Sequence, residues 1–506
     1  MIDQHGSLAE KFIKKGVWLY IFSFIIAPMG YIIKIIVSGE LSVSELGILY
    51  GIISLITMIS AYNDFGMTES INHFVPKFVT EKRFDKVKSI LLYALIAQMS
   101  TGISIALFFY FGADYISEHY FKSIAAAGSL KVFAFYFLGI NVLQILTVFL
   151  QSIQNTFLQK SIELIRMICT LLLTVGVFMM DYGSLVNYSY TWVLGIYIGI
   201  IFAVTLFYFK YFKLYFQNER ILWDKDLFIT IFKYGGLVFL GSQAGVILSQ
   251  IDMQMIIFML GTTDAGYYTN YLSIISIPFM IIGPIFGLLF PVFSELHSKG
   301  ENDKITLVKS IFTNNFLIIG LAFNIFLFTF SLPIAYVLFG IKYLTSGVIL
   351  QYSVLFLVFN FLLQINFSIL AGVGKVKERL KIVLAAVGIN FVTNIIFIYL
   401  FGVIGAAIAT GIGWIYMWGA TEYFTRDDYP LKLDKINIIK NVLFLGVLSF
   451  IILYIFGNFT YFTFNISRIF GFFILLGTSL IYFCIFFIIN YSMFQNFYSE
   501  IKKLRK

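Results

Sequence analysis

Long apolar runs alternate with short polar segments from one end of the chain to the other. Each of fourteen runs holds about 20 or more mostly apolar residues, enough for a helix to cross the hydrocarbon layer of a membrane. Gly, Pro, Asn and charged residues bound the runs, and no connection is long enough to form a soluble domain. The pattern predicts an all-α polytopic membrane protein with about 14 transmembrane helices, near 14–38, 47–75, 88–111, 130–150, 158–180, 190–210, 231–260, 265–293, 308–332, 346–370, 380–400, 403–424, 437–457 and 468–490.

Composition supports this interpretation, because 60% of the 506 residues are hydrophobic and only 12% are charged, against about 25% charged residues in soluble domains. The net charge of +9 would suit nucleic acid, but the basic residues lie in short connections, so we expect no nucleic-acid partner. Cys169 and Cys484 lie inside apolar runs and cannot frame a disulfide scaffold. The many Phe, Ile, Lys and Asn residues are typical of a low-GC bacterium.

Lysine and arginine are unevenly divided between the two sides of the predicted membrane. One set of alternate connections holds most of them, whereas the opposite set holds only Lys122, Lys342 and Arg468, with Lys131 at the edge of a span. Since short cytoplasmic loops carry the excess of positive charge, we expect a multi-pass protein of the cytoplasmic membrane with both termini in the cytoplasm. The first apolar run is too long for a signal peptide and predicts a retained span.

A constant offset of 219 residues relates positions in the two halves of the chain. It joins Gly16 to Gly235, Gly47 to Gly266, and Gly183 to Gly402. The repeat predicts two six-helix lobes, an N-lobe at 1–218 and a C-lobe at 219–430, followed at 431–506 by two additional spans and a basic tail. Because six is even, both copies have the same orientation, as in transporters built from parallel repeats, whose substrates bind between the halves.

Two segments resemble a known family. The stretch "ELGILYGIISLITMISAYNDFGMTESI", Glu45 to Ile71, resembles the second span of Wzx-type polysaccharide and oligosaccharide-lipid flippases, members of the multidrug/oligosaccharidyl-lipid/polysaccharide (MOP) exporter superfamily. Its opening ends at Tyr50, and an Asp-x-Gly follows at 64–66. "FGVIGAAIAT", 401–410, resembles the family's turn into span 12. The first-half counterpart, "DYGSLVNYSY", departs from this pattern, and His73 stands where relatives often carry arginine.

The resemblance implies two lobes in a V shape, as in MATE and other MOP transporters, around a central cavity. It further implies alternating access that flips a polyprenyl-pyrophosphate-linked oligosaccharide from the cytoplasmic to the exterior leaflet, for polysaccharide assembly at the cell envelope. Membrane lipids and the polymerase or glycosyltransferase machinery are then the expected partners. We expect no cofactor, and a proton gradient, a sodium gradient or the membrane potential as the driving force.

Ionisable residues inside the spans are the first candidates for the site. Asp252 lies in the apolar stretch Gly245–Leu260, where a carboxylate costs about 2.5–3.5 kcal/mol and needs a partner, water or a proton. The repeat offset places Lys34 opposite Met253, which predicts a Lys34–Asp252 gate on the exterior side and a phosphate contact for Lys34. The alternatives are a lysine that reaches the membrane interface and a carboxylate with another partner.

Further candidates are a gate residue and several cavity residues. Asp64 matches the family's Asp-x-Gly and is a candidate for ion coupling, or it is only a carboxylate at a helix end. Arg166 is a second candidate cation, unless Glu163, one turn away, neutralises it. Amides can contact sugar hydroxyls but more often join helices; the candidate amides for the cavity are Gln243, Gln250, Gln254 and Gln364.

Other functions have weaker support in the sequence. The four histidines are scattered and give no metal-ligand spacing, so no metal site is expected. The connections are too short to build a catalytic site, which disfavours a polyprenol-dependent glycosyltransferase or polymerase, and an enzyme in general. A cation-coupled multidrug exporter of the same fold is the main alternative to a flippase.

Overall fold

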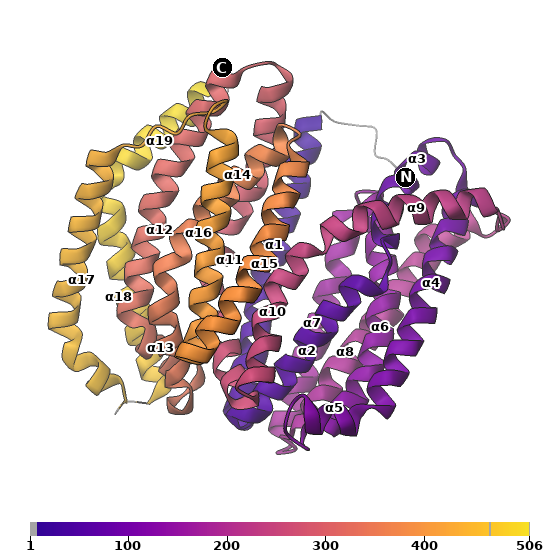
Figure 1. Ribbon diagram of the computed structural model, residues 1–506, viewed down its shortest axis with the longest axis horizontal. Helices are drawn as coiled ribbons and strands as arrows, with labels where there is room; N and C mark the ends of the chain where they lie inside the picture. The colour runs from indigo at the N-terminus through magenta and orange to yellow at the C-terminus, as the bar shows by residue number, and fades with distance from the viewer. Residues whose placement is uncertain (1–7, 465–466, 505–506) are drawn as a thin grey trace. The chain divides into compact units, whose positions relative to one another are not determined.

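The computed structural model describes residues 8–464 and 467–504, which form helices and connections without a strand in those ranges (Figure 1). The chain divides into two compact units, and the boundary in the sequence falls between Gly266 and Tyr267. Unit 1 therefore includes the helical region just before Gly266, which the repeat assigns to the C-lobe. The lobe limits drawn from the repeat, 1–218 and 219–430, stay predictions.

Unit 1 is built around α6, the helix whose apolar window is the most buried of the unit's membrane spans. It contacts α2, α3, α4, α5, α7 and α8, while α1 packs along α7, and α10 along α2. The helices of the unit are α1 Leu8–Glu40, α2 Val43–Asn63, α3 Met67–Thr80, α4 Phe84–Phe111, α5 Ala113–His119, α6 Ala126–Ser152, α7 Thr156–Met179, α8 Leu185–Phe207, the π-helix η1 Tyr208–Phe216, α9 Lys225–Ser242 and α10 Ala244–Met259.

Unit 2 is organised around α12, which contacts α13, α14, α17, α18 and α19, while α15 and α16 form a tightly packed pair. The first residues of α11 belong to unit 1 and the rest to unit 2. The helices are α11 Thr262–Ser298, α12 Asn302–Phe339, η2 Ile341–Tyr343, α13 Leu344–Ser353, η3 Val354–Phe356, α14 Leu357–Gly372, α15 Val376–Phe401, α16 Val403–Thr425, α17 Lys435–Phe464, α18 Arg468–Ile489 and α19 Tyr491–Leu504.

Among the described residues, eleven helices are long and apolar enough to cross a membrane, and the bent α11 is a twelfth. The other two predicted spans are helical as well: 231–260 is divided between α9 and α10 at Gln243, and 437–457 lies in α17. The prediction of an all-α, multi-pass membrane fold is confirmed, whereas fourteen membrane crossings stay a prediction.

The predicted span 47–75 is wrong as a single helix, because α2 ends at Asn63 and α3 begins at Met67. Phe65 and Gly66 between them have positive φ angles of 46° and 79°. A Cβ on Gly66 would lie 2.2 Å from the carbonyl oxygen of Gly235 in α9, so only glycine fits here. The 219-residue offset carries this break to Gly283, next to the position where α11 bends by 44°.

Two glycines of the repeat, Gly47 and Gly266, pack against the same close crossing of α2 and the start of α11. A Cβ on Gly47 would lie 1.8 Å from the carbonyl oxygen of Thr262, and one on Gly266 would lie 2.0 Å from that of Val43. The hydroxyls of Ser44 and Thr262 also hydrogen-bond at 2.7 Å. Close approach of the two backbones therefore explains why this repeat pair is glycine.

A set of hydrogen bonds that occurs once in each unit is a further sign of the repeat. In unit 1 these bonds join α4 to the segment that precedes α9, and we call them the N-latch. Lys88 Nζ donates to the carbonyl oxygens of Phe216 at 2.9 Å and Glu219 at 2.8 Å. Leu222 N–H donates to Ser89 Oγ at 2.8 Å. The Tyr93 hydroxyl donates to the Leu222 carbonyl oxygen and accepts from the backbone N–H of Asp224 at 3.1 Å.

The same contacts recur in unit 2, where α12 binds the segment that precedes α17; we call this the C-latch. Lys309 Nζ donates to the Tyr429 carbonyl at 3.0 Å, and Lys432 N–H donates to Ser310 Oγ at 3.1 Å. Asn314 takes the place of the tyrosine: its Nδ2 donates to the Lys432 carbonyl at 2.9 Å, and its Oδ1 accepts from Asp434 N–H at 3.0 Å.

The latches identify a repeated sequence, "VKSI", at 87–90 and 308–311. The two copies of "VKSI" are 221 residues apart. The segments bound to them, which precede α9 and α17, are 210 residues apart, so that Leu222 is equivalent to Lys432 and Asp224 to Asp434. Asp224 and Asp434 then accept backbone N–H bonds at the start of α9 and α17, respectively. In each unit the helix that carries "VKSI", α4 or α12, thus fixes the start of a later helix, α9 or α17.

Candidate functional site

The first candidate site lies where α1 and α10 meet the N-terminal half of α2 in unit 1. Lys34 of α1 is buried, and its Nζ lies 4.3 Å from the centroid of the Tyr50 ring, a cation–π contact. Tyr50 in turn meets the ring of Trp192 from α8, at 6.4 Å between centroids. Among the described residues, the buried indole N–H of Trp192 has no hydrogen-bond partner.

Gln254 connects α10 to the same stretch of α2. Its Nε2 donates to Ser54 Oγ at 2.8 Å and to the Gly51 carbonyl at 3.3 Å, and its Oε1 accepts from the Tyr120 hydroxyl at 2.7 Å. Burial raises the pKa of the Tyr120 phenol, so this hydroxyl remains a donor at neutral pH. Of the predicted cavity amides, Gln254 is therefore tied into a helix-joining network.

Asp252 stands two residues before Gln254 on α10 and is buried, as Lys34 is. The structure thus places both predicted gate residues in unit 1, on the two helices that contact α2 at residues 50–54. A bond between Lys34 and Asp252 stays a prediction. The alternative of a lysine extended to the membrane surface is disfavoured, because the side chain is 7% exposed and lies on an aromatic ring.

Asp64 lies at the break between α2 and α3 and is 2% exposed. Its Oδ1 accepts from Gly66 N–H at 2.9 Å and its Oδ2 from Thr68 N–H at 3.1 Å, so the carboxylate caps the first turn of α3. Beside it, Asn63 Nδ2 donates to Asn141 Oδ1 of α6 at 2.9 Å. The site is a polar helix junction, and a coupling role for Asp64 stays a prediction.

The remaining predicted residues do not join these clusters. Glu163 accepts from Lys160 Nζ at 2.7 Å and forms no ion pair with Arg166, whose stem packs on Gly199. Their mutual neutralisation is therefore not seen. Gln243 stands at the α9–α10 break, Gln250 Nε2 donates to Ser249 Oγ at 3.1 Å, and Gln364 Nε2 donates to Asn360 Oδ1 at 3.1 Å within α14 of unit 2.

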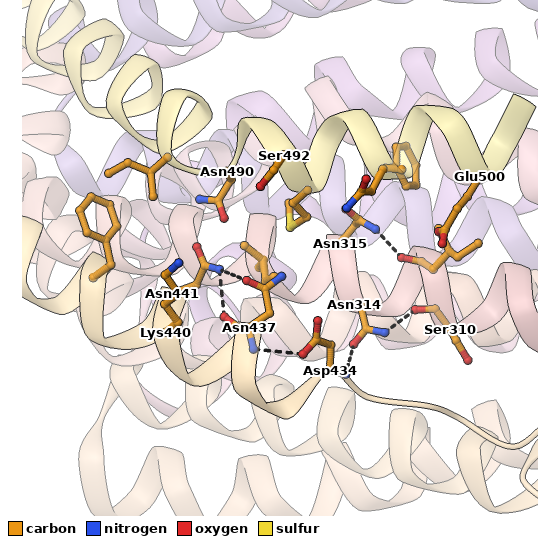
Figure 2. A pocket seen from close by; sticks show the side chains of 17 residues that line it. Ser310, Asn314, Asn315, Asp434, Asn437, Lys440, Asn441, Asn490, Ser492 and Glu500 are labelled. Atoms are coloured by element: carbon orange, nitrogen blue, oxygen red, sulfur yellow. Dashed lines mark hydrogen bonds between the residues drawn. The ribbon is translucent and has the colours of Figure 1, made fainter.

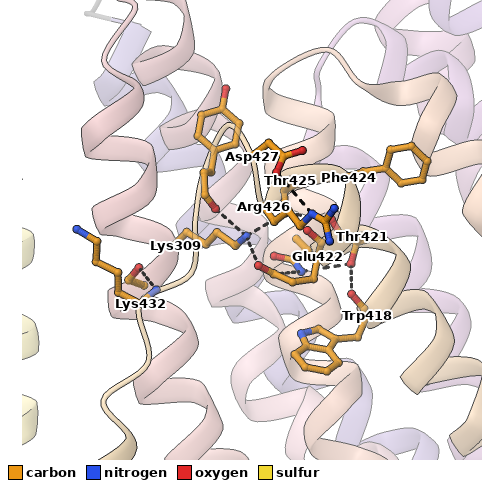
Figure 3. A network of polar contacts seen from close by, with 12 residues as sticks. Lys309, Trp418, Thr421, Glu422, Phe424, Thr425, Arg426, Asp427 and Lys432 are labelled. Atoms are coloured by element: carbon orange, nitrogen blue, oxygen red, sulfur yellow. Dashed lines mark hydrogen bonds and ion pairs between the residues drawn. The ribbon is translucent and has the colours of Figure 1, made fainter.

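A second polar site, which the sequence did not predict, surrounds Lys309 in unit 2 (Figure 3). The Lys309 side chain is completely buried, and its Nζ lies 2.8 Å from Glu422 Oε1 and 2.9 Å from Thr425 Oγ1, both on α16. Glu422 Oε2 also accepts from Asn366 Nδ2 of α14 at 3.1 Å. The ion pair therefore ties α12, α14 and α16 together beside the C-latch.

The sequence held two signals for this site. Lys309 belongs to the repeated "VKSI", and Glu422 is the one acidic residue between Val403 and Thr425. A lysine at the edge of an apolar run resembles a residue of the span boundary, so Lys309 was not among the predicted site residues. Its partner lies 113 residues away in the chain, and no local periodicity reports such a contact.

Comparisons with known proteins identify the family of this chain. Residues 12–297 match the family described as "Polysaccharide biosynthesis protein", over more than half of the chain. The chain belongs to this polysaccharide biosynthesis family. It is 27% identical over 428 residues to "Uncharacterized membrane protein MJ1068" of Methanocaldococcus jannaschii, covering 81% of this chain and 83% of that protein. It is 25% identical over 192 residues to "Probable low-salt glycan biosynthesis flippase Agl15" of Haloferax volcanii, covering 36% and 39%.

Solved structures of MOP transporters share the fold of this family member. The lipid II flippase MurJ in an inward closed conformation superposes with a TM-score of 0.69 and 16% identity, covering 93% of this chain and 98% of that chain. An inward-facing multidrug resistance MATE transporter gives 0.64 and 15%, covering 83% and 98%. At these identities the likeness shows the fold alone.

The family and the fold together confirm several predictions. The chain is a multi-pass membrane protein of the polysaccharide biosynthesis family, and it has the fold of the MurJ and MATE transporters. The absence of a metal site stays a prediction, although no group of three metal-ligating side chains occurs among the residues that the structure describes. The two curated relatives are archaeal, so the bacterial source indicated by composition stays a prediction.

Proposed function

We propose that this protein flips a polyprenyl-pyrophosphate-linked oligosaccharide from the cytoplasmic to the exterior leaflet by alternating access. The observation that carries the proposal is a buried lysine, Lys34 of α1, which lies against Tyr50 of α2, in a chain of the polysaccharide biosynthesis family. A pyrophosphate needs a cation at a site of low hydration, where a charge-assisted hydrogen bond is strong.

The groups around Lys34 suit such a headgroup. The indole N–H of Trp192, which has no partner in the described part of the chain, can donate to a phosphate oxygen. The hydroxyl and amide groups of Tyr120, Ser54 and Gln254 can exchange hydrogen bonds with sugar hydroxyls. The polyprenol tail can remain in lipid during the transfer. Sugars are supplied and consumed by glycosyltransferases and a polymerase, which we propose as functional partners.

Two carboxylates could couple transfer to an energy source. In this proposal Asp252 competes with pyrophosphate for Lys34 and so closes the exterior side, while Asp64 responds to protons or sodium ions at the α2–α3 break. A proton gradient, a sodium gradient or the membrane potential supplies the energy. Both termini lie in the cytoplasm, as the lysine and arginine distribution predicts.

Transfer of lipid-linked saccharide by proteoliposomes tests the proposal. Lys34→Ala should lower the rate by about tenfold or more, the effect of one lost charge-assisted hydrogen bond, while Lys34→Arg retains part of it. Lys131→Ala, which removes an exposed ion pair with Asp114 in the same unit, is the matched control. Unchanged transfer by Lys34→Ala would refute the phosphate contact of Lys34. Transport of cationic drugs in place of the saccharide lipid would refute the flippase and favour the multidrug exporter.

The gate has its own test. Lys34→Asp and Asp252→Lys should each lower transfer, and the double exchange should restore stability more than either single change, because opposite charges face each other again. Transfer should not fully recover, since the cation has moved to α10. If the effects of the two substitutions on stability are additive, Lys34 and Asp252 do not interact. This result would refute the gate but leave the phosphate contact of Lys34 standing.

A further inference from the structure

The internal repeat allows each residue of the C-latch to be compared with its counterpart in the N-latch. Around the N-latch four buried positions hold tyrosine, alanine, leucine and isoleucine, at Tyr93, Ala94, Leu227 and Ile231. The latch offsets of 221 and 210 carry them to four asparagines, Asn314, Asn315, Asn437 and Asn441. The same scaffold is therefore filled by apolar side chains in unit 1 and lined by amides in unit 2.

The amides of unit 2 border a cavity of about 490 Å³ between α12, α17 and the α18–α19 junction (Figure 2). Asn490, Ser492 and Asn496 line its third side. In unit 1 the rings of Trp223 and Phe228 pack on Tyr93, at 6.0 and 5.4 Å between centroids. The cavity of unit 2 lies where the aromatic filling of unit 1 has no equivalent.

Three amide oxygens at this cavity lack a donor. Asn315 is 8% exposed, and its Oδ1 is buried without a partner in the described part of the chain. Asn441 and Asn490, 3% and 4% exposed, use their Nδ2 groups on Asn437 and Phe486, and their Oδ1 atoms accept no bond among the residues described. A buried acceptor such as Asn315 Oδ1 is nearly always satisfied, and two further amide oxygens are without a described donor, so the cavity is suited to a ligand that carries several donors.

The charges at the cavity favour a neutral ligand. Its ionisable lining residues are Asp434, Lys440 and Glu500, so two carboxylates face one ammonium group and an anion gains little there. Asp434 is already engaged with Asn437 N–H at 3.1 Å. Neutral hydroxyl groups can donate to the amide oxygens and accept from the lysine, and the rings of Phe444 and Phe497 offer an apolar face.

The position of the cavity favours a lipid headgroup. Helix α12 has 38 residues, about 57 Å at 1.5 Å per residue, so it extends beyond a hydrocarbon layer of about 30 Å. The lining residues belong to the first half of α12, the start of α17, the end of α18 and α19. The predicted spans place these helix ends at the edge of the hydrocarbon layer. A headgroup can enter from the membrane interface while its acyl or prenyl chains stay in lipid.

We propose that this cavity binds the neutral, hydroxyl-rich glycosyl headgroup of a membrane lipid. The site lies wholly within unit 2 and does not rest on the proposed transfer of a saccharide through the protein. A resident glycolipid and a lipid-linked saccharide offer the same hydroxyl groups to Asn315, Asn441 and Asn490.

Native mass spectrometry of the full-length protein released from phosphatidylcholine nanodiscs tests the site. Nanodiscs are doped with diglucosyl diacylglycerol, glucosyl polyprenyl phosphate or phosphatidylglycerol. The protein should retain a glucosyl lipid about tenfold more than phosphatidylglycerol. Asn441→Ile, which installs the residue of unit 1, and Asn496→Ala on α19 should abolish that preference, while Asn302→Ala at the start of α12, outside the cavity, should keep it.

Each result decides the proposal. Preference for diglucosyl diacylglycerol alone supports it with a resident glycolipid, and preference for both glucosyl lipids extends it to the lipid-linked saccharide. Should Asn441→Ile fail to fold, Asn496→Ala carries the test. Equal retention of all three lipids, preference for phosphatidylglycerol, preference unchanged in the folded variants, or an equal loss in Asn302→Ala overturns it.

Discussion

The N-latch and the C-latch are both built on a Lys-Ser dipeptide, but the two lysines differ in burial and in their hydrogen-bond partners. Lys88 is partly exposed and donates to two uncharged carbonyl oxygens. Lys309 is completely buried and donates to one carbonyl, one hydroxyl and the carboxylate of Glu422. Both lysines hold a connecting segment against the helix that carries them, α4 or α12, yet only Lys309 is paired with a carboxylate.

The difference follows from the cost of burying a charge. An ammonium group near water keeps part of its hydration, so carbonyl oxygens are sufficient partners for Lys88. A fully buried ammonium group requires an opposite charge and further hydrogen bonds, because desolvation costs several kcal/mol per ion in proteins. In unit 2 Glu422 supplies the opposite charge and Thr425 a further hydrogen bond. As a result, the packing of three helices depends on one ion pair.

The largest expected effect comes from removing that counter-charge. Glu422→Leu leaves Lys309 buried without a carboxylate and should lower the free energy of unfolding by about 3 kcal/mol, the lower end for a buried pair, because the Glu422 side chain is 22% exposed. Thermal unfolding of the purified protein in detergent measures this.

The double variant Lys309→Met with Glu422→Leu provides the control for this effect. It should recover most of the stability, since apolar residues of similar volume can replace a buried pair. A double variant as unstable as Glu422→Leu would mean that the helix contacts, and not the unpaired charge, cause the loss.

A smaller effect is expected in the N-latch. Lys88→Met removes two hydrogen bonds to carbonyls at a partly exposed site, where water can satisfy the released oxygens, and should cost about 1 kcal/mol. The same unfolding measurement applies, with Lys86→Met on the same helix as the control. If Lys88→Met and Glu422→Leu cost the same, the contrast between exposed and buried latches is wrong.

The helix breaks offer a second comparison between the units. In unit 1 the break carries Asp64 and Gly66, whereas the bend of α11 in unit 2 follows Gly283, and Pro284 comes next in the sequence. Proline bends a helix by removing a backbone donor and needs no side-chain acceptor. The carboxylate of Asp64 instead accepts two backbone N–H groups.

Asp64→Asn therefore separates a capping role from a coupling role. Asparagine also caps helices, so stability should change by less than about 1 kcal/mol. If Asp64 couples an ion gradient, saccharide transfer should fall strongly and lose its dependence on an imposed proton or sodium gradient. Transfer that keeps its rate and its gradient dependence would assign Asp64 to the cap alone.

Much of the fold was predictable from the sequence, because apolar length and basic connections report membrane spans directly. Burial of Asp252 was also expected, since a carboxylate within a long apolar run lies far from water, whereas the sequence left open a Lys34 side chain that reaches the membrane interface. The breaks after Asn63 and at Gln243 were missed, as hydropathy does not register a positive φ or a helix interruption in apolar surroundings. The latches were missed because their offsets, 221 and 210, differ from the 219 of the glycines.

The smallest effect on stability, and the sharpest check of the parallel repeat, comes from paired cysteines at exposed positions in equivalent connections. Lys122→Cys and Lys342→Cys, one in each unit, should both react with an impermeant thiol reagent from outside the cell. Glu81→Cys and Lys299→Cys should both be protected until the membrane is opened. All four side chains are exposed at the surface of their units, so protection reports the membrane side and not burial. If the two cysteines of an equivalent pair label from opposite sides, the units are inverted relative to each other in the membrane. If residues 81 and 299 label from outside while residues 122 and 342 are protected, the predicted orientation of the whole protein is reversed.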